Sequence, residues 1–389
     1  MLFECRKKVC IIVLELKLER EDLMQDKRYK RRNVEKKMTV GTVIRRILLC
    51  VGTALLAVIV TVVSACLVVC YGPGTTIRDT LVLSAKQASA TKWIPGLFLS
   101  KSAVDSILAS GDEVDAEYVS QDEVAGDFSD RWAENPDGLI YEPVNGPTFK
   151  GYVLLIKSPS RVKVGLASDD FTRGARIFEV ADKYNAAAAI NGGEFEDIGG
   201  MGDGATPIGL TYSFGKCVWN DGKTRTFVGF DANDKMVVAD SMTKEKADSL
   251  GIRDCVCFQY GNVLISSSAD GNVKINRRNG NLAVSQRTAI GQCADGTVIF
   301  IVTDGRSASS LGATYNDIID ILLSYGAVNA VMLDGGSSSS MYYRDWFTKY
   351  NVDTSELDTH QKKGLVSKYR AFAEPRNIPT YFIVTKEAE

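Results

Sequence analysis

The chain has 389 residues, a formal net charge of −2 and one histidine, His360. Its length allows one large domain or two modest ones, and a single histidine argues against most zinc hydrolase designs and against a Ser-His-Asp triad. We expect His360 to be an ordinary surface residue. The small net charge conceals two opposed runs: residues 27–46 hold nine Lys or Arg against one acid, and residues 112–142 hold eleven Asp or Glu against one base.

The first recognisable element is the apolar run 47–71, which holds 25 residues without a charge. About 20 apolar residues cross a bilayer as a helix, and the basic residues before the run predict a cytoplasmic N-terminus and an extracellular C-terminal part. We therefore expect residues 1–46 to be a cytoplasmic basic segment and 47–71 to be a transmembrane signal anchor in the cell membrane. On this interpretation the basic run determines the orientation of the chain in the membrane. We therefore do not take it as a nucleic-acid-binding signal and expect no nucleic-acid partner.

Three other interpretations of this run stay open. A buried core helix is one, although the length and the basic flank argue against it. A cleaved signal peptide is another, although the apolar and basic regions are longer than ordinary ones. The sequence V-S-A-C at 63–66 resembles a lipidation site at Cys66, yet apolar residues follow it where a polar tether is expected. The true start could also lie at Met24 or Met38.

The nine cysteines divide between two parts of the chain, five before residue 72 and four beyond it. The four are Cys217, Cys255, Cys257 and Cys293. One or two disulfides are possible in an oxidising compartment, and their state is open. The C-V-C spacing at 255–257 places both thiols on one face of a strand, which favours buried structural thiols over a redox or zinc motif.

Beyond the apolar run, we expect residues 72–147 to form a juxtamembrane region with helix signals and an acidic stretch that is a linker or an edge of the fold. From Thr148 onward, short β-branched runs separated by turn sequences predict strands of four to seven residues. Helical patterns are few and cover 174–184, 243–250 and 314–325. The fold class is therefore α+β, a mixed β-sheet core with a few helices, and the catalytic domain is placed at 148–386.

The first polar motif ends the small-residue strand A-A-A-A-I at 186–190. It continues as Asn191, Gly192, Gly193 and Glu194. Adjacent glycines let a backbone approach a ligand closely or adopt positive φ. Asn191 can donate and accept hydrogen bonds, and Glu194 can bind sugar hydroxyls or exchange protons. The alternative is a tight turn after a buried strand.

The most informative motif is a pair of Asp-Gly turns, at Asp304 and Asp334. Each follows a buried-strand pattern, 298–303 or 327–333, and the segment between them reads as a helix over 314–325 with a capping-box start. Strand, helix, strand is a βαβ unit. If the two strands are parallel, both carboxylates lie at the same edge of one sheet, where ligands tend to bind.

Cationic and hydrogen-bonding residues accompany these turns. Arg287 and Arg306 could clamp an anion, because a guanidinium binds phosphate or carboxylate through two parallel hydrogen bonds. Gly335, Gly336 and Ser338 could present N–H and hydroxyl donors to substrate. The serines after Gly336 are not expected to supply a His-activated nucleophile, given the lone histidine.

No cofactor is expected, although the three carboxylates could instead hold a divalent cation. We assign no metal ligands, because the carboxylates lack D-x-D spacing.

These motifs together resemble the phosphodiester glycosidase family, and the chain is most similar to its bacterial, membrane-anchored members. The resemblance covers about residues 148–386 and rests on the order and spacing of several motifs. They are I-N-G-G-E-F (190–195), T-P-I-G-L (206–210), R-T-A-I-G (287–291), D-G-R (304–306), A-V-M-L-D-G-G-S-S-S (330–339) and R-N-I-P-T-Y-F-I-V (376–384). Glu194 departs from the family pattern, so it ranks below the two Asp as a catalytic residue.

The resemblance implies hydrolysis of a sugar joined through its anomeric carbon to a phosphodiester, on envelope glycopolymer or exopolysaccharide. Arg287 and Arg306 would hold the phosphate, and Asp304 or Asp334 would activate water or attack the anomeric carbon. Asn191, Gly192, Gly193 and Ser338 would contact the sugar or phosphate. Two other functions stay open: a metal-dependent phosphodiesterase that acts at phosphorus, and a non-catalytic protein that binds glycopolymer. The sugar and the oligomeric state are not predicted.

Overall fold

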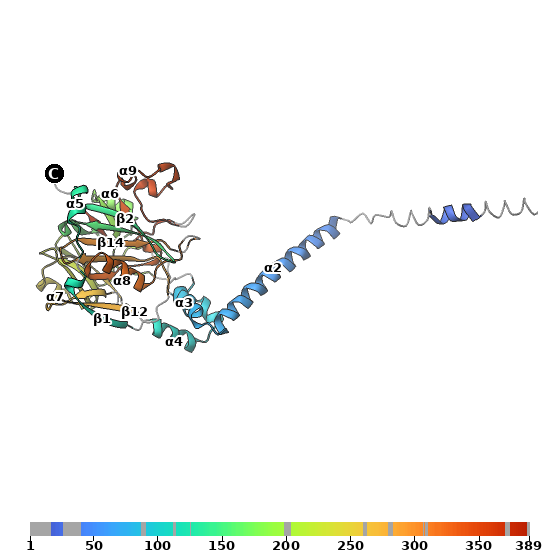
Figure 1. Cartoon of the computed structure of the whole chain (residues 1–389), viewed down its shortest axis with the longest axis horizontal. Helices are drawn as coiled ribbons and strands as arrows, with labels where there is room; N and C mark the ends of the chain where they lie inside the picture. The colour runs from blue at the N-terminus through green and yellow to red at the C-terminus, as the bar shows by residue number, and fades with distance from the viewer. Residues whose placement is uncertain are drawn as a thin grey trace, which may run out of the picture. The chain divides into compact units, whose positions relative to one another are not determined.

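The structure is a computed structural model, and its chain divides into two compact units, Met1–Val68 and Val69–Glu389 (Figure 1). The residues that the structure describes are 17–25, 40–86, 91–111, 114–124, 126–197, 204–259, 263–278, 283–305, 307, 310–369 and 374–386.

The apolar run forms one long helix, α2 (Val40–Tyr71), which begins before the predicted boundary. Among the described residues, α2 is the helix that is long and apolar enough to cross a membrane, and none of its window is buried in protein. The hydroxyls of Thr53 and Thr61 donate to the carbonyls of Leu49 and Ala57 one turn earlier, so these polar groups are satisfied within the helix.

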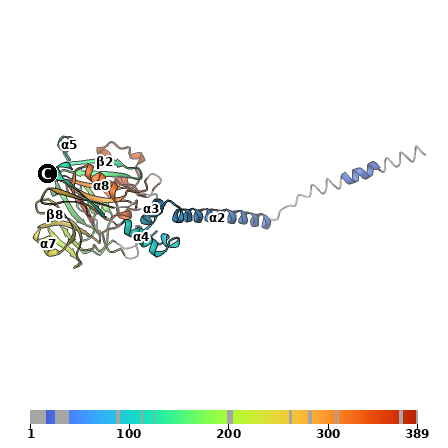
Figure 2. The same ribbon diagram turned by 60° about the horizontal axis from the view of Figure 1, so that its bottom comes forward.

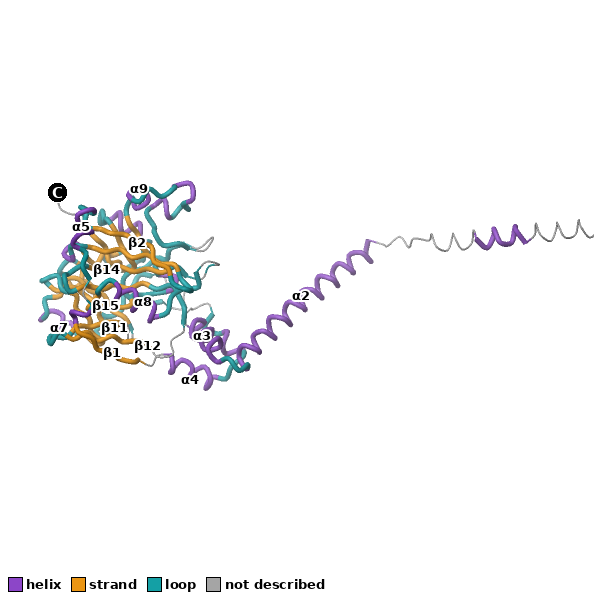
Figure 3. The backbone as a smooth tube through the Cα atoms, in the orientation of Figure 1, coloured by secondary structure: helices purple, strands orange, loops and turns teal. Residues whose placement is uncertain are grey.

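Strands hold more residues of the Val69–Glu389 unit than helices do (Figure 3), and the described strands form three sheets. The largest has eight strands in the order β1 (Val114–Ser120), β12 (Asn272–Arg278), β11 (Val263–Ser267), β15 (Ala327–Met332), β13 (Thr288–Cys293), β14 (Val298–Thr303), β3 (Lys150–Ile156) and β2 (Leu139–Asn145). A four-stranded sheet has the order β16 (Met341–Tyr343), β5 (Ala188–Asn191), β17 (Thr380–Val384) and β4 (Val162–Leu166). A five-stranded sheet has the order β7 (Lys216–Asn220), β6 (Leu210–Ser213), β10 (Ile252–Phe258), β8 (Arg225–Asp231) and β9 (Met236–Met242).

Both edge strands of the large sheet come from the acidic stretch. β1 pairs along its length with β12, and β2 pairs along its length with β3. Charged side chains on an edge strand discourage pairing with other chains, which accounts for acidic residues at these positions. The sheet therefore begins before Thr148, where the sequence placed the start of the catalytic domain.

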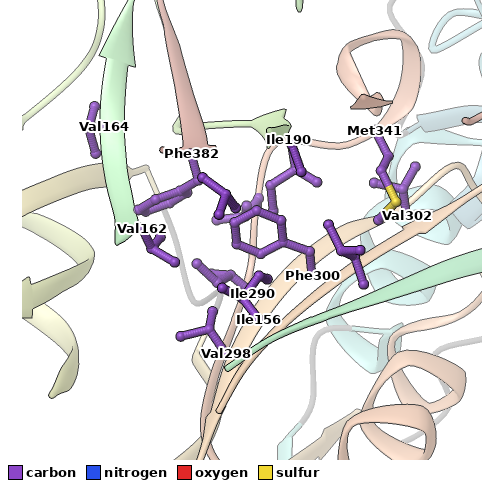
Figure 4. Close-up of a cluster of buried hydrophobic side chains, with 14 of the residues drawn as sticks. Ile156, Val162, Val164, Ile190, Ile290, Val298, Phe300, Val302, Met341 and Phe382 are labelled. Carbon is purple, nitrogen blue, oxygen red and sulfur yellow. The ribbon is translucent and has the colours of Figure 1, made fainter. Parts of the chain in front are cut away.

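The core between the large and four-stranded sheets explains why β14 is apolar at successive positions. Val298, Phe300 and Val302 face the four-stranded sheet, and Figure 4 shows Phe300 beside Phe382 and Ile190. The alternate residues of β14 pack on the opposite face against α8 (Tyr315–Ser324). A strand buried on both faces reads as a continuous apolar run.

Helix α8 confirms its predicted start. Thr314 accepts a hydrogen bond from the Asp317 N–H, and the Asp317 carboxylate accepts one from the Thr314 N–H. Such a capping box satisfies two backbone donors that the first turn leaves without partners. Gly326 follows the helix at φ 80°, which a glycine adopts without strain.

The other helices of the Val69–Glu389 unit are short. They are α3 (Thr75–Lys86), α4 (Lys101–Gly111), α5 (Ser129–Glu134), α6 (Ile177–Lys183), α7 (Lys244–Ser249), α9 (Trp346–Lys349) and the 3₁₀ turns η1 (Ile94–Leu97), η2 (Gln121–Glu123), η3 (Pro159–Arg161), η5 (Gly336–Ser338), η6 (Thr354–Glu356) and η7 (Gln361–Lys363). The patterns at 174–184 and 243–250 correspond to α6 and α7, and α7 contacts the five-stranded sheet through β10 (Figure 2). The α+β fold class is confirmed.

The C-V-C thiols are buried and free, as expected. Cys255 and Cys257 both lie in the apolar cluster of the five-stranded sheet. Burial raises the pKa of Cys257 to about 12, so this thiol is protonated and unreactive at neutral pH.

Candidate active site

The two Asp-Gly turns leave the same edge of the large sheet, as predicted. Strands β14 and β15 each pair antiparallel with β13, so they run parallel to each other with β13 between them. Asp304 follows the end of β14, and Asp334 follows the end of β15. The predicted βαβ unit thus has a third strand inserted, and the two turns flank the start of β13.

Gln286 joins the two turns, a role that no local pattern predicts. Its backbone carbonyl accepts a hydrogen bond of 3.0 Å from the Gly336 N–H. Its side chain covers Gly305 so closely that a Cβ added there would lie 1.9 Å from the Gln286 Cγ. A residue other than glycine at 305 would therefore push Gln286 away.

Asp304 is held by hydrogen bonds to both carboxylate oxygens. Its Oδ2 accepts from the Tyr152 hydroxyl at 2.8 Å, and its Oδ1 accepts from the Lys368 N–H at 2.8 Å. The residue is 6% exposed. Burial raises the pKa of Asp304 above its usual range, while these two hydrogen bonds and the charges of Lys368 and Lys150 oppose that rise.

Asp334 has a different environment. The pKa of Asp334 is raised to about 7, mainly by burial and also by the negative charge of Glu194, while Ser338, Arg376 and the Gly335 N–H oppose this rise. The residue is half-buried. A carboxyl group with a pKa near 7 exchanges protons readily at neutral pH, which is the property of a general acid or base.

Glu194 lies near Asp334 and is positioned by the five-stranded sheet. Its Oε2 accepts a hydrogen bond of 2.7 Å from the Gln259 N–H, and its own N–H donates to the Cys257 carbonyl at 3.1 Å. Burial raises the pKa of Glu194, while the Gln259 hydrogen bond and the charge of Arg225 oppose this. The structure therefore brings Asp334 and Glu194 together in one polar site.

Asn191 lies behind this site. The residue is fully buried, and its Nδ2 donates to the Asp334 carbonyl at 2.6 Å. Its Oδ1 accepts from the Thr288 hydroxyl at 2.7 Å and from the Ser340 N–H at 3.1 Å. These bonds fix the turn that carries Asp334, an arrangement that differs from the direct substrate contact we expected of Asn191.

Gly192 and Gly193 are required by close backbone packing. A Cβ on Gly192 would lie 2.6 Å from the Thr380 Oγ1, and one on Gly193 would lie 2.8 Å from the Cys257 carbonyl oxygen. Their N–H groups donate to the Thr380 carbonyl and hydroxyl. The structure thus uses these glycines to bring two sheets together, and their predicted substrate contact is untested.

The loop after Asp334 uses its donors internally. Gly336 adopts φ 63° and its N–H donates to the Gln286 carbonyl, while the Ser338 hydroxyl and the Gly335 N–H lower the pKa of Asp334. The loop therefore organises Asp334 first, and contact of Gly335, Gly336 or Ser338 with substrate stays a prediction.

Arg287 differs most from its expected role. It is 6% exposed, its Nε donates to the Ala313 carbonyl, and its Nη2 donates to the Ala283 carbonyl. Its guanidinium lies 4.6 Å from the centre of the Tyr315 ring. The side chain ties loops together, a different arrangement from the exposed anion clamp that we expected. Arg306 lies outside the described residues.

Two other arginines lie near the carboxylates, and neither was predicted. Arg376 acts electrostatically on Asp334, forms an ion pair with Asp197 and stacks over the Phe195 ring at 4.9 Å. Arg225 acts on Glu194, forms an ion pair of 2.9 Å with Asp221, and has a buried Nε without a hydrogen-bond partner in the described part of the chain. Arg376 opens one of the motifs quoted above, but that motif gives no local signal of a role for its arginine.

His360 is less exposed than predicted. Its side chain is 16% exposed, its Nε2 lies 3.3 Å from Glu374, and its ring stacks on Phe178. This histidine is therefore only partly exposed, because its ring packs on Phe178 of α6.

Metal ligands do not converge in the described ranges, where no three His, Cys, Asp or Glu side chains lie together in a way that could hold an ion. Cavities of about 490 and 360 Å³ lie around Arg344 and Asp345, and no predicted site residue lines either one. The site is therefore defined by its carboxylates and arginines. The absence of a cofactor stays an expectation.

Residues 184–385 match the phosphodiester glycosidase family. The chain belongs to this family. The matched range contains every carboxylate and arginine of the site described above, and this supports a glycosidase-type function. It excludes β1 to β4, which complete the large and four-stranded sheets.

Similar proteins are known from bacteria and vertebrates. The SPbeta prophage-derived uncharacterized protein YomE of Bacillus subtilis (strain 168) is 53% identical over 113 residues, which are 26% of this chain and 18% of that protein. The catalytic domain of zebrafish N-acetylglucosamine-1-phosphodiester alpha-N-acetylglucosaminidase, auto-inhibited by its pro-peptide, is 17% identical, with a TM-score of 0.48 over 72% of this chain and 91% of that one. A hypothetical protein from Synechocystis is 16% identical, with a TM-score of 0.36 over 63% of this chain and 62% of that one.

Proposed function

We propose that the protein is a membrane-anchored hydrolase that acts outside the cytoplasm. It cleaves the glycosidic bond of a sugar-1-phosphodiester and releases free sugar and a phosphomonoester, with envelope glycopolymer or exopolysaccharide as the substrate. The observation that carries this proposal is the Asp334 carboxyl group in the phosphodiester glycosidase domain. This group interacts with Glu194, the two carboxylates interact with Arg376 and Arg225, and the pKa of Asp334 is about 7.

The chemistry requires one carboxylate that handles a proton. Water attacks the anomeric carbon, the bond from that carbon to the phosphate oxygen breaks, and the bonding electrons leave with the phosphate. Asp334 accepts the proton of the attacking water. We assign this role to Asp334 because both oxygens of Asp304 already accept hydrogen bonds within the protein, so Asp304 serves as a positioning residue.

The leaving phosphate needs positive charge. Arg376 and Arg225 each act on one of the two carboxylates, and their side chains are 21% and 14% exposed. A phosphate near either one would gain charge-assisted hydrogen bonds, and these strengthen as negative charge develops on the departing oxygen. We therefore assign phosphate binding to Arg376 and Arg225 in place of Arg287.

The membrane setting rests on α2 and on the basic residues before it. The helix is long enough to span a bilayer, and nine Lys or Arg in residues 27–46 favour a cytoplasmic N-terminus. In this topology the carboxylate site lies outside the cell.

Hydrolysis in ¹⁸O-water by the full-length protein tests the reaction. A panel of sugar-1-phosphodiesters is offered, and we expect the label in the released sugar, because the bond to carbon breaks. Label in the phosphate, with activity lost on addition of a chelator, would show a metal-dependent phosphodiesterase. Saturable binding of the panel without turnover would show a glycopolymer-binding protein.

A further inference from the structure

Exposed apolar side chains gather in one short segment after α2. In the described part of Val69–Glu389, ten large apolar side chains are exposed, and six of them lie between Tyr71 and Leu97. They are Tyr71, Ile77, Leu81, Trp93, Ile94 and Leu97. Soluble proteins seldom expose so many apolar residues together unless another surface covers them.

This segment is folded and has its own buried apolar cluster, so its exposed apolar residues are not core residues of an unfolded segment. We call residues 71–86 and 91–111 the juxtamembrane hairpin. In α3, Val82 and Leu83 are buried against α4, and α3 and α4 lie in contact (Figure 1). Ile77 and Leu81 lie one turn apart on another face of α3, where they are 62% and 54% exposed.

The exposed set has the composition of a membrane interface. Trp93 is 60% exposed and Tyr71 is 69% exposed, and both residue types favour the level of lipid headgroups. Residues 71–111 hold four Lys or Arg against two Asp, so the segment carries positive charge in a chain that is acidic overall. Basic residues near a bilayer are attracted to anionic lipids.

We propose that the juxtamembrane hairpin lies in the headgroup layer of the same bilayer that α2 crosses, with its exposed apolar side chains at the acyl boundary. This inference rests on the proposed membrane anchoring. Continuity favours the bilayer over any other partner, because α3 begins four residues after Tyr71, the end of α2.

The hairpin also contacts the segment that leads into the active site. The Val284 N–H donates to the Ser84 hydroxyl at 3.1 Å, and Ala283 packs in the same apolar cluster as α3 and α4. Arg287 then donates to the Ala283 carbonyl at 3.0 Å. From Tyr71 to Ser84 the chain reaches at most about 30 Å, so the hairpin keeps this segment within that distance of the membrane.

Lipid-borne quenching of tryptophan tests the proposal. The full-length protein is placed, one chain per disc, in nanodiscs that contain phosphatidylglycerol with or without bromine on the acyl chains. We expect bromine to remove most of the fluorescence that Trp93 contributes, measured as the difference between the wild type and Trp93→Phe. Trp219→Phe is the matched control and retains the lipid-dependent quenching, because Trp219 packs against Phe171 in the protein.

A pair of substitutions separates the loss of membrane contact from the general effect of adding a charge to an exposed apolar position. Leu97→Asp is expected to lose most of the quenching, whereas Tyr118→Asp, also 65% exposed but on the edge strand β1, keeps it. Quenching of Trp93 by aqueous iodide without quenching by brominated lipid would overturn the proposal. So would protection of Trp93 that appears only in discs with two chains, since a second copy would then cover the segment. None of these readouts requires turnover, so they stand apart from the proposed hydrolysis.

Discussion

The loop after β14 and the loop after β15 leave the same edge of the large sheet, and each begins with an aspartate followed by glycine. Asp304 is almost fully buried, and the two hydrogen bonds that it accepts oppose the pKa rise caused by burial. Asp334 has Glu194 as a neighbour, and its pKa rises to about 7. The same two-residue motif therefore supplies one carboxylate that organises loops and one that can exchange protons near neutral pH.

The largest effect is expected from removing the proton acceptor. Asp334→Asn keeps the shape of the side chain but cannot accept the proton of water, so turnover should fall by about 10²–10⁴-fold or more. Initial rates with an active sugar-1-phosphodiester measure this, and circular dichroism checks the fold. The exposed Asp240→Asn is the control. Activity at the wild-type level in Asp334→Asn would remove Asp334 from the reaction.

The second effect is on the pH dependence of stability. The folded-state pKa of Asp334, about 7, lies above its unfolded value of about 3.9, so the folded protein holds a proton that the unfolded chain releases. The free energy of unfolding should therefore fall as pH rises from about 4 to 7, by about 2–4 kcal/mol relative to Asp334→Asn. Urea unfolding of both proteins at several pH values measures the difference. If the free energy of unfolding had the same pH dependence in both proteins, the pKa of Asp334 would have its ordinary value.

Asp304→Asn should lower stability at neutral pH, whereas Asp334→Asn should not lower it there. An asparagine can accept from only one of the two donors, and its amide N–H₂ would face the Lys368 N–H or the Tyr152 hydroxyl. Leaving one buried donor unsatisfied costs about 1–3 kcal/mol. Thermal and urea unfolding test this, with Tyr152→Phe as the milder partner change. Unchanged stability in Asp304→Asn would mean that the two aspartates do not differ as described.

The smallest effect is expected at the residue that joins the two turns. Gln286→Ala keeps the backbone carbonyl that accepts from Gly336 but removes the side chain that covers Gly305. We expect a loss below about 1 kcal/mol in stability and a lower kcat with KM little changed. Steady-state kinetics measure this. A rise in KM alone would assign Gln286 to substrate binding instead.

The local patterns predicted much of the fold. The capping box at Thr314, the apolar run of β14 and the parallel direction of β14 and β15 each depend on neighbouring residues in the sequence, so they could be inferred from it. The insertion of β13 between the two strands could not, because pairing of distant strands leaves no mark on either one.

The candidate site was only partly predictable for the same reason. Asp334 and Glu194 come together as expected of site residues, whereas Asn191 and Arg287 are buried and engaged with backbone groups. Burial depends on which strands and loops pack over a residue. The residues next to Arg287 or Asn191 in the sequence do not reveal which distant strands and loops these are. Arg376 and Arg225 were missed because each reaches the site from a sheet or loop distant in the sequence.

The most direct test of the difference between the two aspartates is to titrate their carboxyl groups. Carbon-13 spectra of the full-length protein labelled at the aspartate carboxyl carbon follow each group from acid to neutral pH. One signal should titrate near pH 7 and should vanish in Asp334→Asn, while it persists in Asp304→Asn. A signal near pH 7 that vanishes in Asp304→Asn instead, or aspartates that all titrate in the ordinary range, would contradict the assignment of proton transfer to Asp334.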